Sequence, residues 1–251
     1  MSDNKKRIVV IGATSAIAEH CARLWVKDNN VVLTLVARDR AKAERVAEDL
    51  RVRNPQSVIN VLEADFIDPV VVARLVGAIC AGGVVNTVLI AHGSLPDQTG
   101  CQQDLAGCHE ALNVNGISPV LFAEAFASHM EKNNQGTLAI IGSVAGDRGR
   151  KSNYVYGAAK GLITRYTQGL QHRLAGTGVK VVLIKPGPTD TPMTAHLKQQ
   201  GGRLANVEEV AGSIVKRLNK GQSVMYVPGK WAIIMMIIRH LPNFVFNKMD
   251  I

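Results

Sequence analysis

The chain of 251 residues is 47% hydrophobic and carries a formal net charge of +9. That length and composition suffice for one continuous buried core, and no composition shift marks a second unit, so residues 1–251 are expected to form a single domain. The basic residues are scattered and only 4% of the chain is aromatic, which argues against a nucleic-acid-binding protein with its basic runs and base-stacking rings.

The amino-terminal MSDNKKR is polar and leads directly into an apolar run, so no signal peptide is expected. Cys21, Cys80, Cys101 and Cys108 match no metal-binding spacing, and a chain of this length does not depend on disulfides. A cytoplasmic protein without a metal site is the expectation.

Short β-branched runs alternate along the chain with longer amphipathic stretches. The runs are RIVVIG, VVLTLVA, SVINVLEA, NTVLIA, GTLAIIG, KVVLIKPG and SVMYVP. Helices are predicted near residues 16–29, 40–53, 69–81, 105–133, 154–176 and 207–219. Because the runs are almost uninterruptedly apolar, they predict parallel strands covered on both faces. Right-handed crossovers then give an α/β fold, a Rossmann-type doubly wound sheet of seven parallel strands flanked by helices. The loops GSLPDQTGCQQD and TDTPMTAHLKQQGGR are predicted to be irregular and to lie on the substrate side.

The segment GATSAIA joins the first predicted strand to the first predicted helix. The amide groups and positive dipole end of that helix are available to a pyrophosphate, and the small side chains allow close approach. The predicted contacts of a dinucleotide here are Gly12, Thr14, Ser15, Ala16 and Ile17.

The second predicted strand ends in Ala37-Arg38-Asp39. An NAD-specific fold places an acid near this point to bind the ribose hydroxyls, and Ala37 stands there instead. Arg38 can pair with a 2′-phosphate, which favours NADP over NAD. The alternative is that Arg38 is a solvated surface residue and that Asp39 only caps the next helix.

Tyr156 and Lys160 are one helical turn apart on a predicted helix, and Ser143 follows the strand GTLAIIG. A tyrosine near pKa 10 transfers a proton poorly at neutral pH, so acid/base chemistry by Tyr156 needs a neighbour that stabilises the phenolate. Lys160 is expected to lower the pKa of the phenol by proximity, and Ser143 can hydrogen-bond an oxygen that gains negative charge. In the family that the chain resembles, described next, this constellation reduces a ketone and the lysine also reaches the cofactor ribose.

These motifs occur in an order that resembles the short-chain dehydrogenase/reductase family over most of the chain. The loop GATSAIA resembles TGxxxGxG with alanines in two glycine positions, YGAAK matches YxxxK, and NVNG and PGPTDT resemble NVxG and PGxxxT. The resemblance implies an oxidoreductase that interconverts ketones and secondary alcohols. It also implies that Asn113 binds a water that relays protons to Lys160. Asn115 and Tyr154 lack the right spacing and are interpreted as packing or loop residues.

Further cofactor contacts follow only from the resemblance. Asp65 and Phe66 match the adenine-contacting acid and its neighbour, while Ala91, His92 and Gly93 stand where the family has NNAG, although only the glycine is retained. His92 is more often a packing or hydrogen-bonding residue than an acid or base in such a position. The segment after the sixth strand contributes Pro186, Gly187, Thr189 and Thr191, with Thr191 at the nicotinamide carboxamide.

Residues 230–251, from KWAIIMMIIRHL onward, form an apolar helix-like tail with Lys230, Arg239, His240 and Lys248 placed around it. The apolar run is far too short to span a bilayer. It can lie in the inner face of a membrane as a peripheral helix, or it can be buried against another subunit of a homodimer or homotetramer. The tail and the altered loop resemble a bacterial branch of the family that reduces a keto-sugar carried on a polyprenyl lipid.

Three functions therefore remain in competition. The leading one is an NADP-dependent reductase of a hydrophobic or lipid-linked ketone. The second is a soluble ketoacyl or small-ketone reductase whose tail makes a subunit contact. The third is an NADP-sensing binding protein without turnover.

Overall fold

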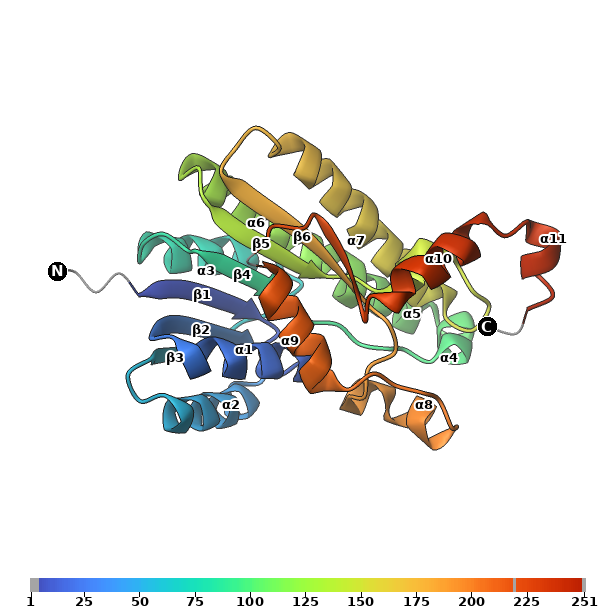
Figure 1. Ribbon diagram of the computed structural model, residues 1–251, viewed down its shortest axis with the longest axis horizontal. Coiled ribbons are helices and arrows are strands. Elements are labelled where there is room, and N and C mark those ends of the chain that lie inside the picture. The colour runs from blue at the N-terminus through green and yellow to red at the C-terminus, as the bar shows by residue number, and fades with distance from the viewer. Residues whose placement is uncertain (1–4, 219, 250–251) are drawn as a thin grey trace.

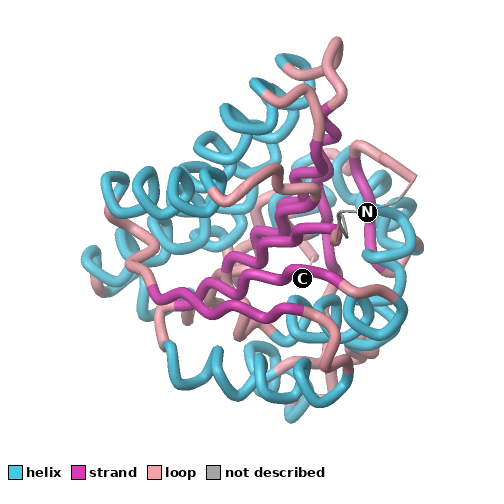
Figure 2. The backbone as a smooth tube through the Cα atoms, turned by 90° about the vertical axis from the view of Figure 1, so that its left-hand side faces the viewer, coloured by secondary structure: helices cyan, strands magenta, loops and turns pink. Residues whose placement is uncertain are grey.

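The computed structural model describes residues 5–218 and 220–249, and its centre is one sheet of parallel strands. The strand order is β3-β2-β1-β4-β5-β6-β7. The chain adds β2 and β3 on one side of β1, then returns to the other side of β1 and adds β4 to β7 there. The predicted seven-stranded, doubly wound sheet is confirmed, and Figure 2 shows it twisted between layers of helix. The strands are β1 (Lys6–Ile11), β2 (Val31–Ala37), β3 (Val58–Glu63), β4 (Thr87–Ile90), β5 (Gly136–Ile141), β6 (Val179–Pro186) and β7 (Val224–Val227).

Helices bury both faces of the sheet because successive strand residues point to opposite sides. Ile8 and Val10 of β1 belong to one buried cluster and Val9 and Ile11 to the other. The first cluster lies under α1 (Ala16–Asp28), α2 (Arg40–Arg53) and α9 (Val207–Leu218). The second lies under α3 (Pro69–Ala81), α6 (Ser118–Lys132) and α7 (Tyr154–Arg173).

The helix predicted over 105–133 is interrupted. It is divided into α5 (Leu105–Leu112), a π turn η1 (Asn113–Ile117) and α6. The amide of Ser118 donates to the carbonyl of Asn113, five residues back, so the turn contains one residue more than an α-helical turn. Every side chain before the π turn is therefore rotated relative to an uninterrupted helix.

The two loops predicted to be irregular contain short helices, α4 (Gln98–Gln103) in the first and η3 (Pro192–Thr194) with α8 (Ala195–Gln199) in the second. Both lie on the side of the sheet where the strands end (Figure 1). A short turn, η2 (Val144–Asp147), follows β5 and leads to α7. Parallel strands present their carboxyl ends at one edge, so these segments gather around the switch point between β1 and β4.

The carboxyl-terminal tail forms α10 (Lys230–His240) and α11 (Asn243–Phe246), which extend from the body of the molecule (Figure 1). Within the described residues no helix is both long and apolar enough to cross a membrane. Asn219, residues 1–4 and residues 250–251, which belong to the predicted elements and domain, lie outside the described residues.

Candidate active site

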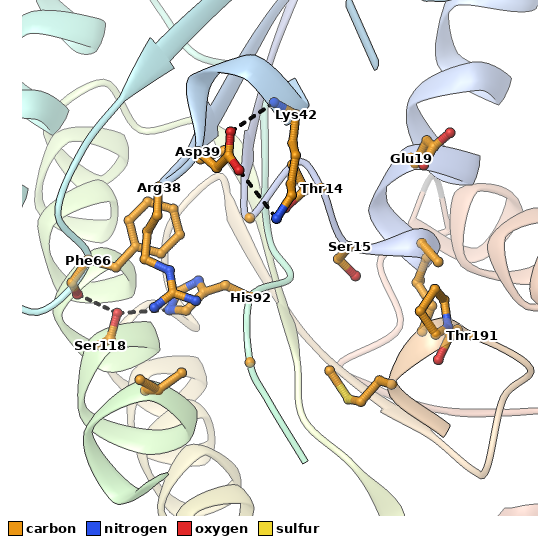
Figure 3. Close-up of a pocket in the computed structure, with 18 of the residues that line it drawn as sticks. Thr14, Ser15, Glu19, Arg38, Asp39, Lys42, Phe66, His92, Ser118 and Thr191 are labelled. Carbon is orange, nitrogen blue, oxygen red and sulfur yellow. Dashed lines mark hydrogen bonds and ion pairs between the residues drawn. The ribbon is translucent and has the colours of Figure 1, made fainter. Parts of the chain in front are cut away.

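A cavity of about 560 Å³ opens at the carboxyl ends of β1, β2 and β4. Figure 3 shows Arg38, Phe66 and His92 on one side of it, across from Ser15 and Thr191. The predicted cofactor residues in its wall are Gly12, Thr14, Ser15, Ala16, Ile17, Arg38, Phe66, His92, Gly93 and Thr191. Its size and its position at the start of α1 suit a dinucleotide, because the first amides of a helix favour phosphate.

Gly12 allows the loop after β1 to approach the loop after β4. Its φ of 82° lies in the left-handed region, and a β-carbon built on it would lie 2.6 Å from the Cβ of His92. Both the positive φ and the lack of space for a β-carbon therefore require glycine at this position. By contrast, Ala18 is fully buried against the sheet, which agrees with the close packing expected of a small residue.

Arg38 is exposed on the rim of this cavity, and among the described residues it makes no ion pair. The neighbouring acid is already engaged: Asp39 accepts a hydrogen bond of 3.0 Å from the amide of Lys42 and pairs with the Lys42 ammonium at 3.2 Å. The backbone hydrogen bond from Lys42 is the main cause of the lowered pKa of Asp39. Asp39 thus caps α2, and the guanidinium beside it is available to a phosphate.

His92 is a half-buried neutral residue in the wall of the cavity. Burial, with smaller contributions from Lys160 and Arg38, lowers the pKa of His92 to about 3. The Ser118 hydroxyl donates its proton to the Phe66 carbonyl, so the 2.8 Å contact to Nε2 requires that His92 donates. The ring also lies edge-on to Phe66 with centroids 4.8 Å apart. The packing and hydrogen-bonding interpretation fits this environment, and acid/base chemistry does not.

A second cavity of about 300 Å³ shares Ser15, Ile17 and Gly93 with the first. Among its lining residues are Asn115, Ser143, Tyr156 and Lys160, which come from η1, the end of β5 and α7. Segments that are far apart in the sequence thus bring these four side chains to the wall of one cavity. The predicted residues Ala91, Pro186, Gly187, Thr189 and Thr191 also line this cavity.

Lys160 lies deep in this site with only 3% of its surface exposed. Its Nζ donates to the Ile141 carbonyl at 3.1 Å and lies 5.7 Å from the ring centroid of Tyr156. Burial lowers the pKa of Lys160 to about 8. Burial of the charged ammonium in this position costs free energy, and its remaining N–H groups can donate to another ligand.

Burial raises the pKa of Tyr156, while a hydrogen bond with Ser143 and the charge of Arg150 oppose that rise. This corrects the expectation that Lys160 depresses the pKa of the phenol, because the stabilising contributions come from Ser143 and Arg150 and the net direction is upward. Ser143 is itself held by a hydrogen bond from the Ala145 amide, 3.1 Å long, at the start of η2. The buried phenol remains protonated and is an acid within reach of Ser143.

The structure does not bring the predicted Asn113 to the site and places Asn115, two positions later, in the wall of the second cavity. Asn113 is partly exposed, contacts the His109 ring at 3.1 Å and is absent from the residues that line the two cavities. Asn115 is fully buried, and its Oδ1 accepts from the Ser94 amide at 2.8 Å while its Nδ2 donates to the Ala111 carbonyl at 2.9 Å.

Asn115 and Lys160 both lie beside Gly93. A β-carbon on Gly93 would lie 2.9 Å from the Asn115 Oδ1 and 3.6 Å from the Lys160 Nζ. The π turn decides which of the two asparagines faces inward, and residue spacing alone carries no signal of that turn.

Asp65 is also displaced from its predicted role. It is exposed, its Oδ1 accepts from the Ile67 amide at 2.7 Å, and it does not appear in the cavity wall, whereas Phe66 and Ile67 do. The short turn after β3 thus presents Ile67 to the cavity and uses the Asp65 carboxylate internally.

Two residues on the loop that follows Ser143 escaped the sequence analysis. Arg148 donates to the carbonyls of Ile238 and Leu241, both at 2.6 Å, and lies over the Phe246 ring at 3.8 Å. It therefore attaches the tail to the active-site loop. Arg150 lines the second cavity, which is called the catalytic cavity below. The only sign of this residue in the sequence is the basic run RGRK.

A buried ion pair anchors the same loop from below. Asp147 accepts from the Lys185 ammonium with one carboxylate oxygen and from the Tyr226 hydroxyl with the other, the latter at 2.7 Å. Both charged side chains are almost fully buried. Lys185 lies on β6 and Tyr226 on β7, so the position of this loop depends on these two strands.

Comparisons with known proteins find a matching family model and relatives of similar length. The family model of the short chain dehydrogenases matches residues 6–202. A protein of Mycobacterium tuberculosis called an uncharacterised oxidoreductase is 30% identical over 245 residues, which span 96% of each chain.

Solved structures resemble the fold at lower identity. A short-chain dehydrogenase from Sphingobium yanoikuyae in complex with NADPH superposes with a TM-score of 0.80 at 21% identity, covering 95% of this chain and 97% of the other. A bulky-bulky ketone specific alcohol dehydrogenase from Comamonas testosteroni gives 0.81 at 20% identity, with coverage of 98% and 96%.

Proposed function

The chain belongs to the short-chain dehydrogenase family and is an oxidoreductase, and we propose that it reduces a ketone to a secondary alcohol with NADPH. The observation that carries this proposal is the convergence of Ser143, Tyr156 and Lys160 on one cavity that adjoins the dinucleotide-sized cavity. These are the residue types that a proton transfer to a carbonyl oxygen requires.

The chain contributes three functions to the reaction. Ser143 donates a hydrogen bond to the carbonyl oxygen, and Tyr156 transfers its proton to that oxygen as negative charge develops. Lys160 and Asn115, which both lie beside Gly93, orient the ribose hydroxyls and the proton path to solvent. NADPH supplies the hydride when it is bound, and the start of α1 with Arg38 would hold its phosphates.

NADP is preferred over NAD because Arg38, in the wall of the cofactor cavity, makes no ion pair among the described residues. The Asp39 carboxylate is occupied by Lys42 and by its helix cap, so it is poorly placed to bind a ribose diol. Arg38 without an ion-pair partner suits a 2′-phosphate.

A screen of ketones for NADPH oxidation tests the activity. Tyr156→Phe is expected to lose at least a hundredfold in rate, because it retains the ring but not the proton. Tyr154→Phe is the matched control, since Tyr154 is exposed and stands two residues earlier. Equal rates in the wild type and Tyr156→Phe would contradict the assignment. NADPH binding without turnover of any ketone would favour the cofactor-sensing protein.

The substrate class is proposed to be hydrophobic or lipid-linked, delivered at an anionic lipid surface through the tail. On α10, Ile233 and Ile237 lie one turn apart and are 64% and 55% exposed, and Phe244 of α11 is 72% exposed. Residues 230–249 contain Lys230, Arg239 and Lys248 and no acid. An apolar surface ringed by cations is the composition of an interfacial helix.

Flotation on vesicles that contain anionic lipid tests this idea. A variant with Ile233, Ile237 and Phe244 changed to serine keeps Trp231 and Met235 packed and is expected to lose flotation. Equal flotation of the two proteins would refute the membrane proposal. Loss of a dimer in the variant, with no flotation of the wild type, would instead favour the ketoacyl or small-ketone reductase with a subunit contact.

A further inference from the structure

Arg150 projects into the catalytic cavity from the loop between η2 and α7. Its charge acts on the Tyr156 phenol, so the guanidinium lies near the reacting end of the cavity. The Nε of Arg150 is buried and has no hydrogen-bond partner. A buried donor without a partner is unfavourable, and it commonly marks a position where a ligand completes the interaction.

Among the described residues, no carboxylate forms an ion pair with this arginine. Asp147 is the acid that interacts electrostatically with Arg150, yet both of its oxygens are already bound, by Lys185 and by Tyr226. Among the described residues Arg150 forms no ion pair. Partial burial lowers the pKa of Arg150, and the charges of Asp147 and Tyr156 oppose that shift only in part.

The residues that line the catalytic cavity also favour an anionic ligand. Among its lining residues are two cations, Arg150 and Lys160, and no aspartate or glutamate. The apolar residues of its lining include Leu95, Val144, Met193 and Leu197. In a low-dielectric cavity of this kind, a fixed guanidinium attracts an anion strongly.

The loop that carries Arg150 is held from two directions. Asp147 is anchored on β6 and β7 by Lys185 and Tyr226, and Arg148 is bound to the tail carbonyls. Anchors three and two residues away restrict where Arg150 can point. A preorganised guanidinium loses little entropy when it binds an anion.

We propose that Arg150 binds an anionic group, a carboxylate or a phosphate, carried by the ketone substrate next to the carbonyl that Tyr156 protonates. Arg150 thereby selects acidic ketones over neutral ones. The inference rests on the proposed ketone reduction, and it narrows the substrate class of the same site. A planar guanidinium can bind either anion through paired hydrogen bonds.

Paired substrates test the inference. The pairs are 4-oxopentanoate with its methyl ester and dihydroxyacetone phosphate with dihydroxyacetone, which separate carboxylate from phosphate recognition. For the wild type we expect kcat/KM to favour the anionic member of at least one pair by about tenfold to a hundredfold, the range of a charge-assisted hydrogen bond. Arg150→Met is expected to abolish the preference mainly through KM, and Arg150→Lys to keep part of it.

The ratio within each pair isolates anion binding from any effect of Arg150 on Tyr156, because the latter changes both members alike. Arg74→Met is the matched control, since Arg74 is an exposed arginine of α3 far from the cavity lining. A ratio that is equal in wild type and Arg150→Met for both pairs would overturn the inference.

Calorimetric binding of 4-oxopentanoate and dihydroxyacetone phosphate to Tyr156→Phe with NADPH gives a readout that needs no turnover. Binding that Arg150→Met removes would support the anion site even if no ketone in the pairs were reduced, in which case only the proposed function fails. Binding of both probes that survives Arg150→Met unchanged would overturn the anion site and leave the proposed reduction intact.

Discussion

The indole of Trp231 lies directly against the α-carbon of Gly187, so that a β-carbon built on Gly187 would overlap the indole nitrogen. Gly187 follows β6 in the wall of the catalytic cavity, and its amide donates to the Val227 carbonyl at 2.9 Å. Trp231 lies in the first turn of α10, which begins at Lys230. The tail is therefore seated on the segment that shapes the active site.

Gly187→Ala is expected to destabilise the protein by roughly 1–3 kcal/mol, because the added methyl overpacks the contact with Trp231. Trp231→Ala removes the obstacle, so the double variant should lose less stability than the sum of the two single changes. Chemical denaturation of the four proteins measures this coupling. Strict additivity would show that the two residues do not meet.

Asn115→Ala is expected to lower kcat for ketone reduction by about tenfold or more, because it removes a buried partner beside Lys160. Asn113→Ala should stay within about twofold of the wild type, since surface changes of this kind rarely reach the site. Steady-state kinetics on both variants decides between the two asparagines. A larger loss in Asn113→Ala would mean that the inward residue had been misassigned.

Arg38→Ser should raise the KM for NADPH and shift the ratio of kcat/KM for NADPH over NADH toward NADH by about tenfold to a hundredfold. This is the loss of a charge-assisted hydrogen bond to the 2′-phosphate. The control is Arg45→Ser, which removes another exposed arginine, on α2. An unchanged ratio in Arg38→Ser would indicate that Arg38 is only a solvated residue.

Lys185→Met should lower the free energy of unfolding by roughly 3–5 kcal/mol, because Asp147 is left buried without its counter-ion. Lys185→Met combined with Asp147→Leu should recover part of that loss, since no isolated charge remains. Urea denaturation at pH 7 compares the variants. A double variant no more stable than the single one would show that apolar groups cannot fill the space of the ion pair.

The lowered pKa of Lys160 predicts a pH dependence of stability. Between its folded pKa of about 8 and its ordinary value of 10.5, the unfolded lysine holds a proton that the folded one has lost. The unfolded state therefore binds more protons, and the contribution of Lys160 to stability rises with pH across this window.

Lys160→Met should lack that rise when the free energies of unfolding of variant and wild type are compared between pH 8 and 9.5. Staying below pH 10 avoids the ionisation of unfolded tyrosine, whose effect has the opposite sign because the pKa of Tyr156 is raised. Parallel curves for the two proteins would contradict the burial argument.

Regular local patterns made most of the fold predictable. The bounds of α2 and α3 match the predicted ranges 40–53 and 69–81, because Asp39 and Asp68 cap their first amides. The Tyr156 and Lys160 pair was recognisable because both residues lie on one continuous helix, where spacing determines the face. The same spacing argument failed for the helix predicted over 105–133, because the π turn changes which helix face Asn113 and Asn115 occupy.

The sequence by itself thus determined the parallel sheet, the edge where ligands bind and the residue types that converge there, because these depend on periodicity and chain order. Tertiary structure alone decided that Asn115 and Lys160 both lie beside Gly93, that Arg150 lines the cavity without an acidic ion-pair partner among the described residues, and that Trp231 rests on Gly187. These relationships join segments that are distant along the chain, and their geometry depends on helix phase and on packing between elements, which no local pattern encodes.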